Sequence, residues 1–313
     1  MQSRFTLRQL EYLVAVSRLG SIAAAAEHLS VSPPSVSSAI TQLEAEFGLP
    51  LFVRRHAFGM APTQAGLQLT KAAGKALESA KGVSDLANLL RGTVQGDLNV
   101  GCLLTFAQIV LPRLRRAYTE AYPDVRFHQF QMHQAGLIEG LRDASLDVAL
   151  TYDLAIPTDL EFVELAVLPP FAILPETHPL AARDSLAIED LADSPMILLD
   201  LPLSAGYFLS LFEQAGVHPT VAERTQDMAV VHSLVGNGFG FSIANTRPVF
   251  STSPDGKPLR FVPLKGRLKP MRMGLLCASG GAQPPTVRAF AELCAGLLDD
   301  AALSGITVRQ AAT

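Results

Sequence analysis

A run of small polar side chains, SPPSVSSAITQ, extends from Ser32 to Gln42 and contains neither Lys nor Arg. Hydroxyl and amide groups near a helix N-terminus can hydrogen-bond to base edges and phosphates, and the helix end itself favours phosphate. We expect this helix to expose Ser35, Ser38, Ala39, Thr41 and Gln42. The residues predicted to contact a nucleic acid on this segment are Ser32, Pro34, Ser35, Ser37, Ser38, Thr41 and Gln42.

Adjacent basic groups follow in LPLFVRRHAFGMAPT, which reads as two short strands around a glycine turn. Arg54, Arg55 and His56 could follow a phosphate backbone from this wing. Residues 1–60 hold five Lys or Arg against four Asp or Glu, an excess of only one positive charge. That charge is small for one copy of the chain, and pairing of two copies would double it.

A second group of candidates follows strand-like segments in the rest of the chain. Ligands of parallel sheets bind at the carboxyl ends of strands, near helix N-termini. Thr105, Ser204 and Asp227 suit helix capping as well as ligand binding, and Arg247 is the one guanidinium available for a ligand carboxylate. Asp153 could serve only to solvate a loop, His133 could lie at a rim, and Tyr207 could stack on a ring or close a cleft. The predicted ligand-binding set is Leu104, Thr105, His133, Tyr152, Asp153, Ser204, Tyr207, Asp227, Asn245 and Arg247.

Catalytic and metal-binding patterns are missing from the sequence. No HExxH, GxSxG or Walker A run occurs, and the seven His residues lack metal spacing. GNGFGFS, beginning at Gly236, follows a helix and precedes a strand, which is the reverse of the dinucleotide-binding order. Cys102, Cys277 and Cys294 are far apart and odd in number, so we expect reduced core thiols. We predict no catalytic residue, no metal site and no cofactor.

The elements that position these residues follow from periodicity and punctuation. Leu7, Leu10, Leu13 and Val14 predict a helix over 7–18, and Ser21 and Ser32 are good N-caps for the next two. Two short helices with a tight break form a helix-turn-helix. Thr63–Gly92 reads as one long helix whose apolar side has no nearby core, which favours pairing with a second chain. After Asp97, short strands alternate with helices, as in parallel α/β sheets covered on both faces.

Length and composition set outer limits. The 313 residues suggest two domains, with 49% hydrophobic residues, 17% charged residues and a net charge of −4. A general polycation is therefore excluded, and any basic surface must be local. The apolar runs are short and interrupted by proline, and the N-terminus does not resemble a signal peptide, so we expect a cytoplasmic protein without membrane contact.

The first sixty-six residues resemble the LysR-type family of bacterial transcriptional regulators. LRQLEYLVAVSRLGSIAAAAEHLSVSPPSVSSAITQLEAEFGLPLFVRR, followed by PTQAG, matches the family pattern in length and spacing. Two departures stand out: Ser38 occupies a position that is usually basic, and Pro62 precedes Thr63 where Leu is usual. The resemblance implies a recognition helix that reads DNA by small polar groups and leaves charge to the wing.

The resemblance also implies the organisation of the whole chain. It predicts an α/β protein with a winged helix-turn-helix domain at 1–62, a linker helix and hinge at 63–92, and a two-lobed effector domain like a periplasmic binding protein at 93–302. Lobe I would comprise 93–167 and 267–302, lobe II would comprise 168–266, and residues 303–313 would form a tail. The expected partners are double-stranded DNA, a small-molecule effector and further copies of the chain in a homodimer or homotetramer.

Three functions compete at this level. The favoured hypothesis is a regulator whose sequence-specific DNA binding responds to a metabolite in the cleft between the lobes. A second is an α/β enzyme with an N-terminal oligomerisation arm, although the chain lacks a convincing nucleophile and base. A third is an architectural DNA binder that needs no ligand.

Overall fold

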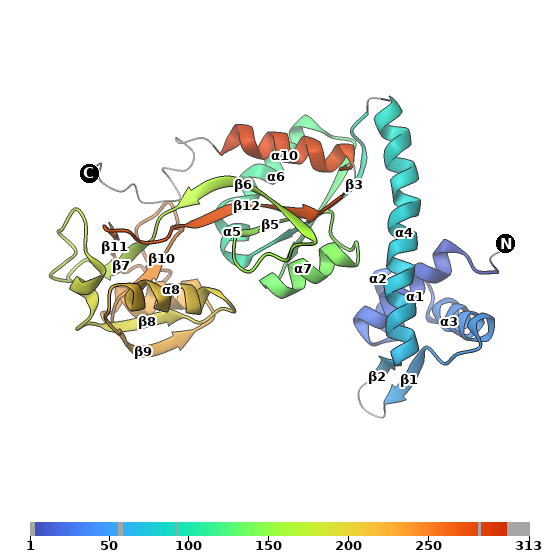
Figure 1. Ribbon diagram of the computed structural model, residues 1–313, viewed down its shortest axis with the longest axis horizontal. Coiled ribbons are helices and arrows are strands. Elements are labelled where there is room, and N and C mark those ends of the chain that lie inside the picture. The colour runs from blue at the N-terminus through green and yellow to red at the C-terminus, as the bar shows by residue number, and fades with distance from the viewer. Residues whose placement is uncertain (1–3, 56–58, 92, 281–282, 299–313) are drawn as a thin grey trace. The chain divides into compact units, whose positions relative to one another are not determined.

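The computed structural model describes residues 4–55, 59–91, 93–280 and 283–298 (Figure 1). His56 of the wing, Gly92 of the hinge and the tail 303–313 lie outside the described residues. The chain divides into an N-terminal unit that ends at Thr93 and also takes in Arg142–Ser145, and a C-terminal unit that comprises the rest of the chain from Val94 onward. In the described part of the chain, no helix is both long and apolar enough to cross a membrane.

Three helices build the N-terminal unit: α1 (Leu7–Leu19), α2 (Ile22–His28) and α3 (Pro33–Phe47). The hydroxyls of Ser21 and Ser32 accept backbone N–H groups at the starts of α2 and α3, as the sequence predicts. Prolines occupy the first turn of α3, where no backbone donor is needed. Gly48 ends α3 in the left-handed conformation at φ 67°.

The core of this unit fixes which side of α3 faces outward. Val36, Ile40 and Leu43 are buried, with 3% exposure or less, and pack with α1 and α2. The prediction that Ala39 is exposed is wrong, because its side chain is 5% exposed and belongs to the same core. Its small volume lets helices approach closely there, so the outward face is narrower than the sequence suggested.

The predicted wing is present as β1 (Phe52–Arg55) paired antiparallel with β2 (Gly59–Pro62). Glu44 of α3 anchors it: its carboxylate accepts the backbone N–H of Leu51 at 2.8 Å and of Phe52 at 3.3 Å. The backbone carbonyl of Leu51 approaches Gly66 so closely that a Cβ there would lie 2.0 Å from it. Glu44 and Gly66 therefore fix the base of the wing from two sides.

The long helix α4 runs from Gln64 to Arg91. Thr63 caps it, accepting the N–H of Gly66 at 2.9 Å, as predicted. Leu69, Ala73 and Leu77 pack against the core of the N-terminal unit. Val83 lies on the same side of the helix beyond that core and is 70% exposed.

The first lobe of the C-terminal unit is a five-stranded sheet in the order β4-β3-β5-β12-β6. Helices α6 and α10 lie together on one face and α7 on the other (Figure 1), and residues of alternating strand positions fill both cores. The elements are β3 (Gly96–Cys102), α5 (Leu104–Ile109), α6 (Leu111–Ala121), β4 (Val125–Gln131), α7 (Gln134–Arg142), β5 (Val148–Tyr152), β6 (Leu160–Leu168), β12 (Met271–Ala278) and α10 (Pro285–Leu297).

The second lobe contains a three-stranded sheet, β10-β7-β11, and a parallel pair, β8-β9, linked by a bridge between Met196 and Phe241. Helices α8 and α9 contact β8. The elements are β7 (Phe171–Pro175), the short helix η1 (Ile188–Leu191), β8 (Pro195–Leu199), α8 (Ser204–Gln214), β9 (Thr220–Thr225), α9 (Met228–Gly236), β10 (Ser242–Ala244) and β11 (Leu259–Pro263).

The expectation of wholly parallel sheets is wrong. Strand β12 pairs antiparallel with both β5 and β6, and β7 pairs antiparallel with β10 and β11. The chain passes from the first lobe to the second after β6 and returns before β12. The sheet of the first lobe is therefore mixed, whereas the second lobe has an antiparallel sheet, β10-β7-β11, beside the parallel pair β8-β9.

Candidate nucleic-acid interface and ligand cavity

The outward face of α3 carries the predicted polar residues. Ser32, Pro34, Ser35, Ser38, Thr41 and Gln42 are exposed, and Ser37 is half-buried. The hydroxyls of Ser32 and Ser35 lie 2.8 Å apart, and Thr41 donates to the carbonyl oxygen of Ser37 at 3.1 Å. The hydrogen of Thr41 and one of the two serine hydroxyl hydrogens are therefore engaged within the helix, and the other serine keeps its hydrogen for a ligand.

Gln42 is held in place from both sides. Its side-chain oxygen accepts Nε2 of Gln9 at 2.7 Å, and its own Nε2 donates to Ser38 Oγ at 3.5 Å. One amide hydrogen and one lone pair of Gln42 stay available, which is the bidentate pattern that an adenine edge requires. The first turn of α1 thus orients a side chain of α3.

The wing places Arg54 and Arg55 on β1, opposite Met60 and Gly59 of β2. Their side chains lie outside the described part of the structure. Their assignment to phosphate contact stays a prediction.

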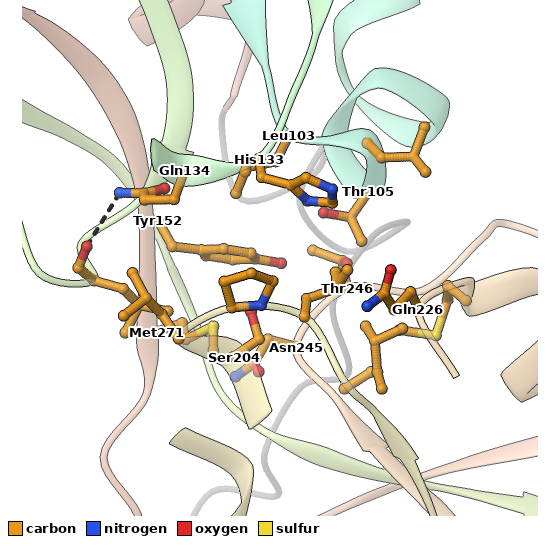
Figure 2. Close-up of a pocket in the computed structure, with 18 of the residues that line it drawn as sticks. Leu103, Thr105, His133, Gln134, Tyr152, Ser204, Gln226, Asn245, Thr246 and Met271 are labelled. Atoms are coloured by element: carbon orange, nitrogen blue, oxygen red, sulfur yellow. Dashed lines mark hydrogen bonds between the residues drawn. The ribbon is translucent and has the colours of Figure 1, made fainter. Parts of the chain in front are cut away.

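A cavity of about 70 Å³ lies in the C-terminal unit, lined from both lobes (Figure 2). That is several times the roughly 10–15 Å³ that one water molecule needs. Six of the residues predicted to bind a ligand line it: Leu104, Thr105, His133, Tyr152, Ser204 and Asn245. The other four, Asp153, Tyr207, Asp227 and Arg247, are not among the lining residues.

Two of the four residues that do not line the cavity use their side chains to bind backbone N–H groups. Asp153 accepts the N–H of Arg272 at 2.9 Å, which ties the end of β5 to β12. Asp227 caps α9 and accepts the N–H of Ala229 at 2.7 Å, so its predicted role as a cap is confirmed. Both carboxylates are negative charges close to the cavity without facing it.

The capping predictions for Thr105 and Ser204 are wrong. Leu103 and Leu203 hold the N-cap positions of α5 and α8, and neither makes a side-chain cap. Thr105 and Ser204 lie one position later or more, inside the first turn, with their side chains at the cavity. Their hydroxyls therefore do not cap a helix, which was the alternative to ligand binding that the sequence offered.

Tyr207 lies behind the cavity and supports Asn245. Its hydroxyl donates to the carbonyl oxygen of Lys269 at 2.8 Å and accepts Nδ2 of Asn245 at 3.1 Å. Nδ2 of Asn245 also donates to the carbonyl oxygen of Leu168 at 2.8 Å. Burial raises the pKa of Tyr207 to about 12, so the phenol is neutral at physiological pH.

Arg247 points to an aromatic ring. Its guanidinium carbon lies 5.3 Å from the centroid of Phe261, a cation–π arrangement on β11. The hypothesis that Arg247 meets a ligand carboxylate in this cavity therefore finds no support in its position.

Tyr152, the last residue of β5, lines the cavity with its ring among the other lining side chains (Figure 2). Burial raises its pKa to about 12, and hydrogen bonds with Thr246 and Thr105 partly oppose that shift. Gln134 accepts the hydroxyl of Thr151 and donates to the carbonyl oxygen of Leu154 at 3.1 Å. These contacts fix polar groups from β5, α5 and the loop after β10 around one opening.

The predicted ligand-binding set omits several lining residues: Gln134, Phe208, Gln226, Met228, Thr246 and Met271. Thr246 and Gln226 stand next to residues that the strand-end rule selected, so the same rule could have found them. Met271 starts a strand rather than ending one, and it reaches the cavity because β12 returns antiparallel. Phe208 lies one turn into α8, where a sequence offers no signal of its direction.

The three cysteines are free and buried. Burial raises the pKa of Cys277 and Cys294 to about 12, and it raises the pKa of Cys102 as well. The protonated thiol therefore dominates at neutral pH, and thiolate chemistry is suppressed. Among the described residues, no group of His, Cys, Asp and Glu is arranged to hold a metal ion.

Comparison with known proteins identifies both units. The family described as bacterial regulatory helix-turn-helix protein, lysR family, matches residues 7–67, and the LysR substrate binding domain matches residues 91–299. The chain belongs to the LysR family of transcriptional regulators. It is therefore a DNA-binding regulator with an effector-binding domain and not an enzyme, which overturns the α/β-enzyme alternative.

Individual relatives of this LysR-family chain agree in length and fold. The transcriptional activator protein LysR of Escherichia coli K12 is 31% identical over 255 residues, covering 81% of this chain and 82% of that protein. The crystal structure of HinK, a LysR family transcriptional regulator from Pseudomonas aeruginosa, shares 32% identity at a TM-score of 0.64, covering 94% of this chain and 99% of HinK. Full-length CbnR in complex with its target DNA shares 25% identity at a TM-score of 0.63, covering 93% of this chain and 99% of CbnR.

Proposed function

We propose that this LysR-family regulator binds a specific DNA sequence as a homo-oligomer, and that a small molecule in the interlobe cavity changes that binding. The observation that carries the proposal is a cavity whose walls come from both lobes, between which the chain passes after β6 and before β12. A ligand that contacts both walls favours one lobe arrangement over others, and a coupling of about 1–3 kcal/mol is typical of such systems.

The DNA-reading surface in this proposal is the outward face of α3 together with the wing. Ser35, Ser38, Thr41 and Gln42 supply base contacts, while Arg54 and Arg55 supply phosphate contacts. The crystal structure of CbnR with its target DNA, a relative of similar length, supports the general mode. A regulator that acts on DNA belongs in the cytoplasm with the chromosome.

The domain limits in this proposal are 1–62 for the winged helix-turn-helix, 63–92 for the linker helix and hinge, and 93–302 for the effector domain. Within the effector domain, lobe II spans 168–266. Homodimer or homotetramer formation would use α4, because Val83 continues the apolar side of that helix past the core of its own unit.

The test begins with the operator. Selection on randomised duplexes with the full-length chain yields a consensus, and fluorescence anisotropy then gives affinity for it. Thermal-shift screening of the full-length chain against amino acids, aromatic acids and neutral alcohols identifies binders, because a ligand specific to the folded state stabilises it by about 2.7 kcal/mol at a hundredfold excess over Kd. We expect at least one binder to change the operator affinity.

A double substitution locates the effect. Thr105→Val with Ser204→Ala removes two hydroxyls from the cavity and should remove both the thermal shift and the change in operator affinity. Thr158→Val with Ser251→Ala removes two exposed hydroxyls that do not line the cavity and should leave both intact. A full response in the first variant would place the ligand elsewhere, and a panel that shifts melting without altering DNA binding would favour the architectural binder.

A further inference from the structure

We infer that the effector is an uncharged, largely apolar molecule with one hydroxyl or N–H donor directed at Oδ1 of Asn245. This inference rests on the proposed effector role of the cavity and adds the chemical class of the ligand. Its starting point is the buried amide of Asn245, which is 2% exposed and lines the cavity.

The orientation of the Asn245 amide follows from its partners. The carbonyl oxygen of Leu168 can only accept, so the atom that faces it at 2.8 Å is the amide nitrogen. The hydroxyl of Tyr207 donates its hydrogen to the carbonyl oxygen of Lys269. Toward Asn245 the Tyr207 oxygen can therefore only accept, and it accepts from the same amide nitrogen. Both amide hydrogens are therefore used, and the oxygen of Asn245 is the atom left over.

That oxygen has no hydrogen-bond partner among the described residues. A buried acceptor without a donor is unfavourable, and native proteins rarely leave one unmatched. Because Asn245 borders the cavity (Figure 2), a ligand can supply the missing donor. A methyl ether or a carboxylate cannot do so, since each offers only acceptors.

The rest of the lining excludes a charge on the ligand. None of the described residues that line the cavity is Lys, Arg, Asp or Glu. Leucine, methionine, proline and aromatic side chains contribute most of the wall, including Leu199, Met228 and Met271. An ion transferred to such a wall loses hydration and meets no Lys or Arg; the imidazole of His133 is the one lining side chain that could pair with an anion.

Helix ends do not replace the missing cation. Asp227 already neutralises the start of α9 with a carboxylate, and α5 is only six residues long. Asp153, beside Tyr152, adds a negative charge near the same wall. Neither α5 nor α8 has a side-chain cap, and α8, with 11 residues, is the longer of the two, so its start is where an anion would have to bind if the inference were wrong.

The experiment uses two matched series on the full-length chain at pH 7. Benzyl alcohol, benzyl methyl ether and benzoate share one ring; cyclohexylmethanol, its methyl ether and cyclohexanecarboxylate share another. We expect calorimetric titration to show each alcohol binding at least about tenfold tighter than its ether and its carboxylate, which differ in the donor and the charge respectively.

Each other outcome overturns the inference. Equal binding of an alcohol and its ether would show that Asn245 receives no donor, and tighter binding of the carboxylates would show a charged ligand class. If carboxylate binding also disappeared in the Thr105→Val, Ser204→Ala variant, the proposed effector site would stand while its ligand class failed. Binding by none of the six compounds would likewise overturn the assigned class.

Substitution of a residue in the cavity wall provides a second, independent test of whether charge decides which ligand binds. Leu104 lines the cavity and is 46% exposed, so a longer polar side chain fits there without a core defect. Leu104→Lys should gain about tenfold in carboxylate affinity by supplying the missing cation, whereas Leu104→Gln, of similar length and no charge, should not. An unchanged carboxylate affinity in the Lys variant would mean that charge does not decide ligand choice.

Discussion

Gln42 is an exposed side chain of α3 whose amide is held from either side, by Gln9 and by Ser38. We predict that Gln42→Ala changes the preferred base at one operator position, at a cost of about 1–3 kcal/mol for the original base. The measurement is selection on randomised duplexes followed by affinity titration of single-base variants.

Ser38→Arg provides the contrasting change at a neighbouring position. It adds a charge rather than a base reader, so it should raise affinity for all DNA sequences and steepen the salt dependence by about one unit per new phosphate contact. An identical consensus for wild type and Gln42→Ala would remove Gln42 from the reading surface.

His232 makes the stability of the second lobe depend on pH. The ring lies in α9, 7% exposed against Phe261, and its Nε2 has no partner among the described residues. Burial lowers its pKa from 6.5 to about 4. Between those values the unfolded chain takes up a proton and the folded one does not, so the free energy of unfolding falls as pH drops from 6.5 to 4.

We predict that His232→Leu removes about 2–3 kcal/mol of that pH-dependent loss. Urea unfolding of the C-terminal unit, followed by circular dichroism at pH 7 and pH 4.5, measures it. His218→Leu, at an exposed position, should keep the wild-type profile. A His232→Leu profile parallel to wild type would mean that the buried ring is protonated in the folded state.

Among the elements, the wing depends on a single carboxylate of α3. Glu44→Ala would leave the backbone N–H groups of Leu51 and Phe52 without their acceptor, so we expect unfolding of the N-terminal unit to cost about 1–3 kcal/mol less. Affinity for all DNA should fall with it, because β1 carries Arg54 and Arg55. Glu46→Ala, on an exposed position of the same helix, removes the same charge without those bonds. Equal effects of the two variants would reduce the result to charge alone.

The boundaries of the helices were largely predictable from the sequence because they depend on local capping residues and on glycines. Ser21, Ser32, Thr63 and Asp227 cap their helices as predicted, and Gly48 ends α3. Directions set by distant packing were not predictable. Ala39 is buried by the other helices of its unit. Thr105 and Ser204 lie in the first turns of their helices, because Leu103 and Leu203 occupy the N-cap positions.

The ligand cavity shows the same difference between positions that local sequence determines and positions that distant packing determines. The strand-end rule found Tyr152 and Asn245, since both follow strands that end at the cavity. It also selected Asp153 and Arg247, whose partners, the backbone of Arg272 and the ring of Phe261, come from strands far along the chain. Met271 was missed because the rule assumes parallel strands, and β12 is antiparallel.

For the molecule as a whole, the long helix α4 sets the expected assembly. Val83 is 70% exposed on the side that Leu69, Ala73 and Leu77 bury. We predict that Val83→Glu shifts the full-length chain toward monomer and weakens operator binding, because a buried carboxylate would face an apolar partner. Sedimentation equilibrium measures the mass. Lys71→Glu, exposed and about 120° around α4 from Val83, should leave it unchanged, and an unaltered mass in Val83→Glu would place the interface elsewhere.

The strand order β4-β3-β5-β12-β6 also has a consequence during synthesis on the ribosome. β5 and β6 are separated in the sheet by β12, which leaves the exit tunnel about 100 residues after β6, or about 5–20 s at ordinary elongation rates. Through that interval one edge of β5 and one edge of β6 lack β12, the partner that the finished sheet gives them. All strands of the second lobe have been synthesised by then, so that lobe can fold first. The sheet of the first lobe is completed only when β12 (Met271–Ala278) inserts between β5 and β6.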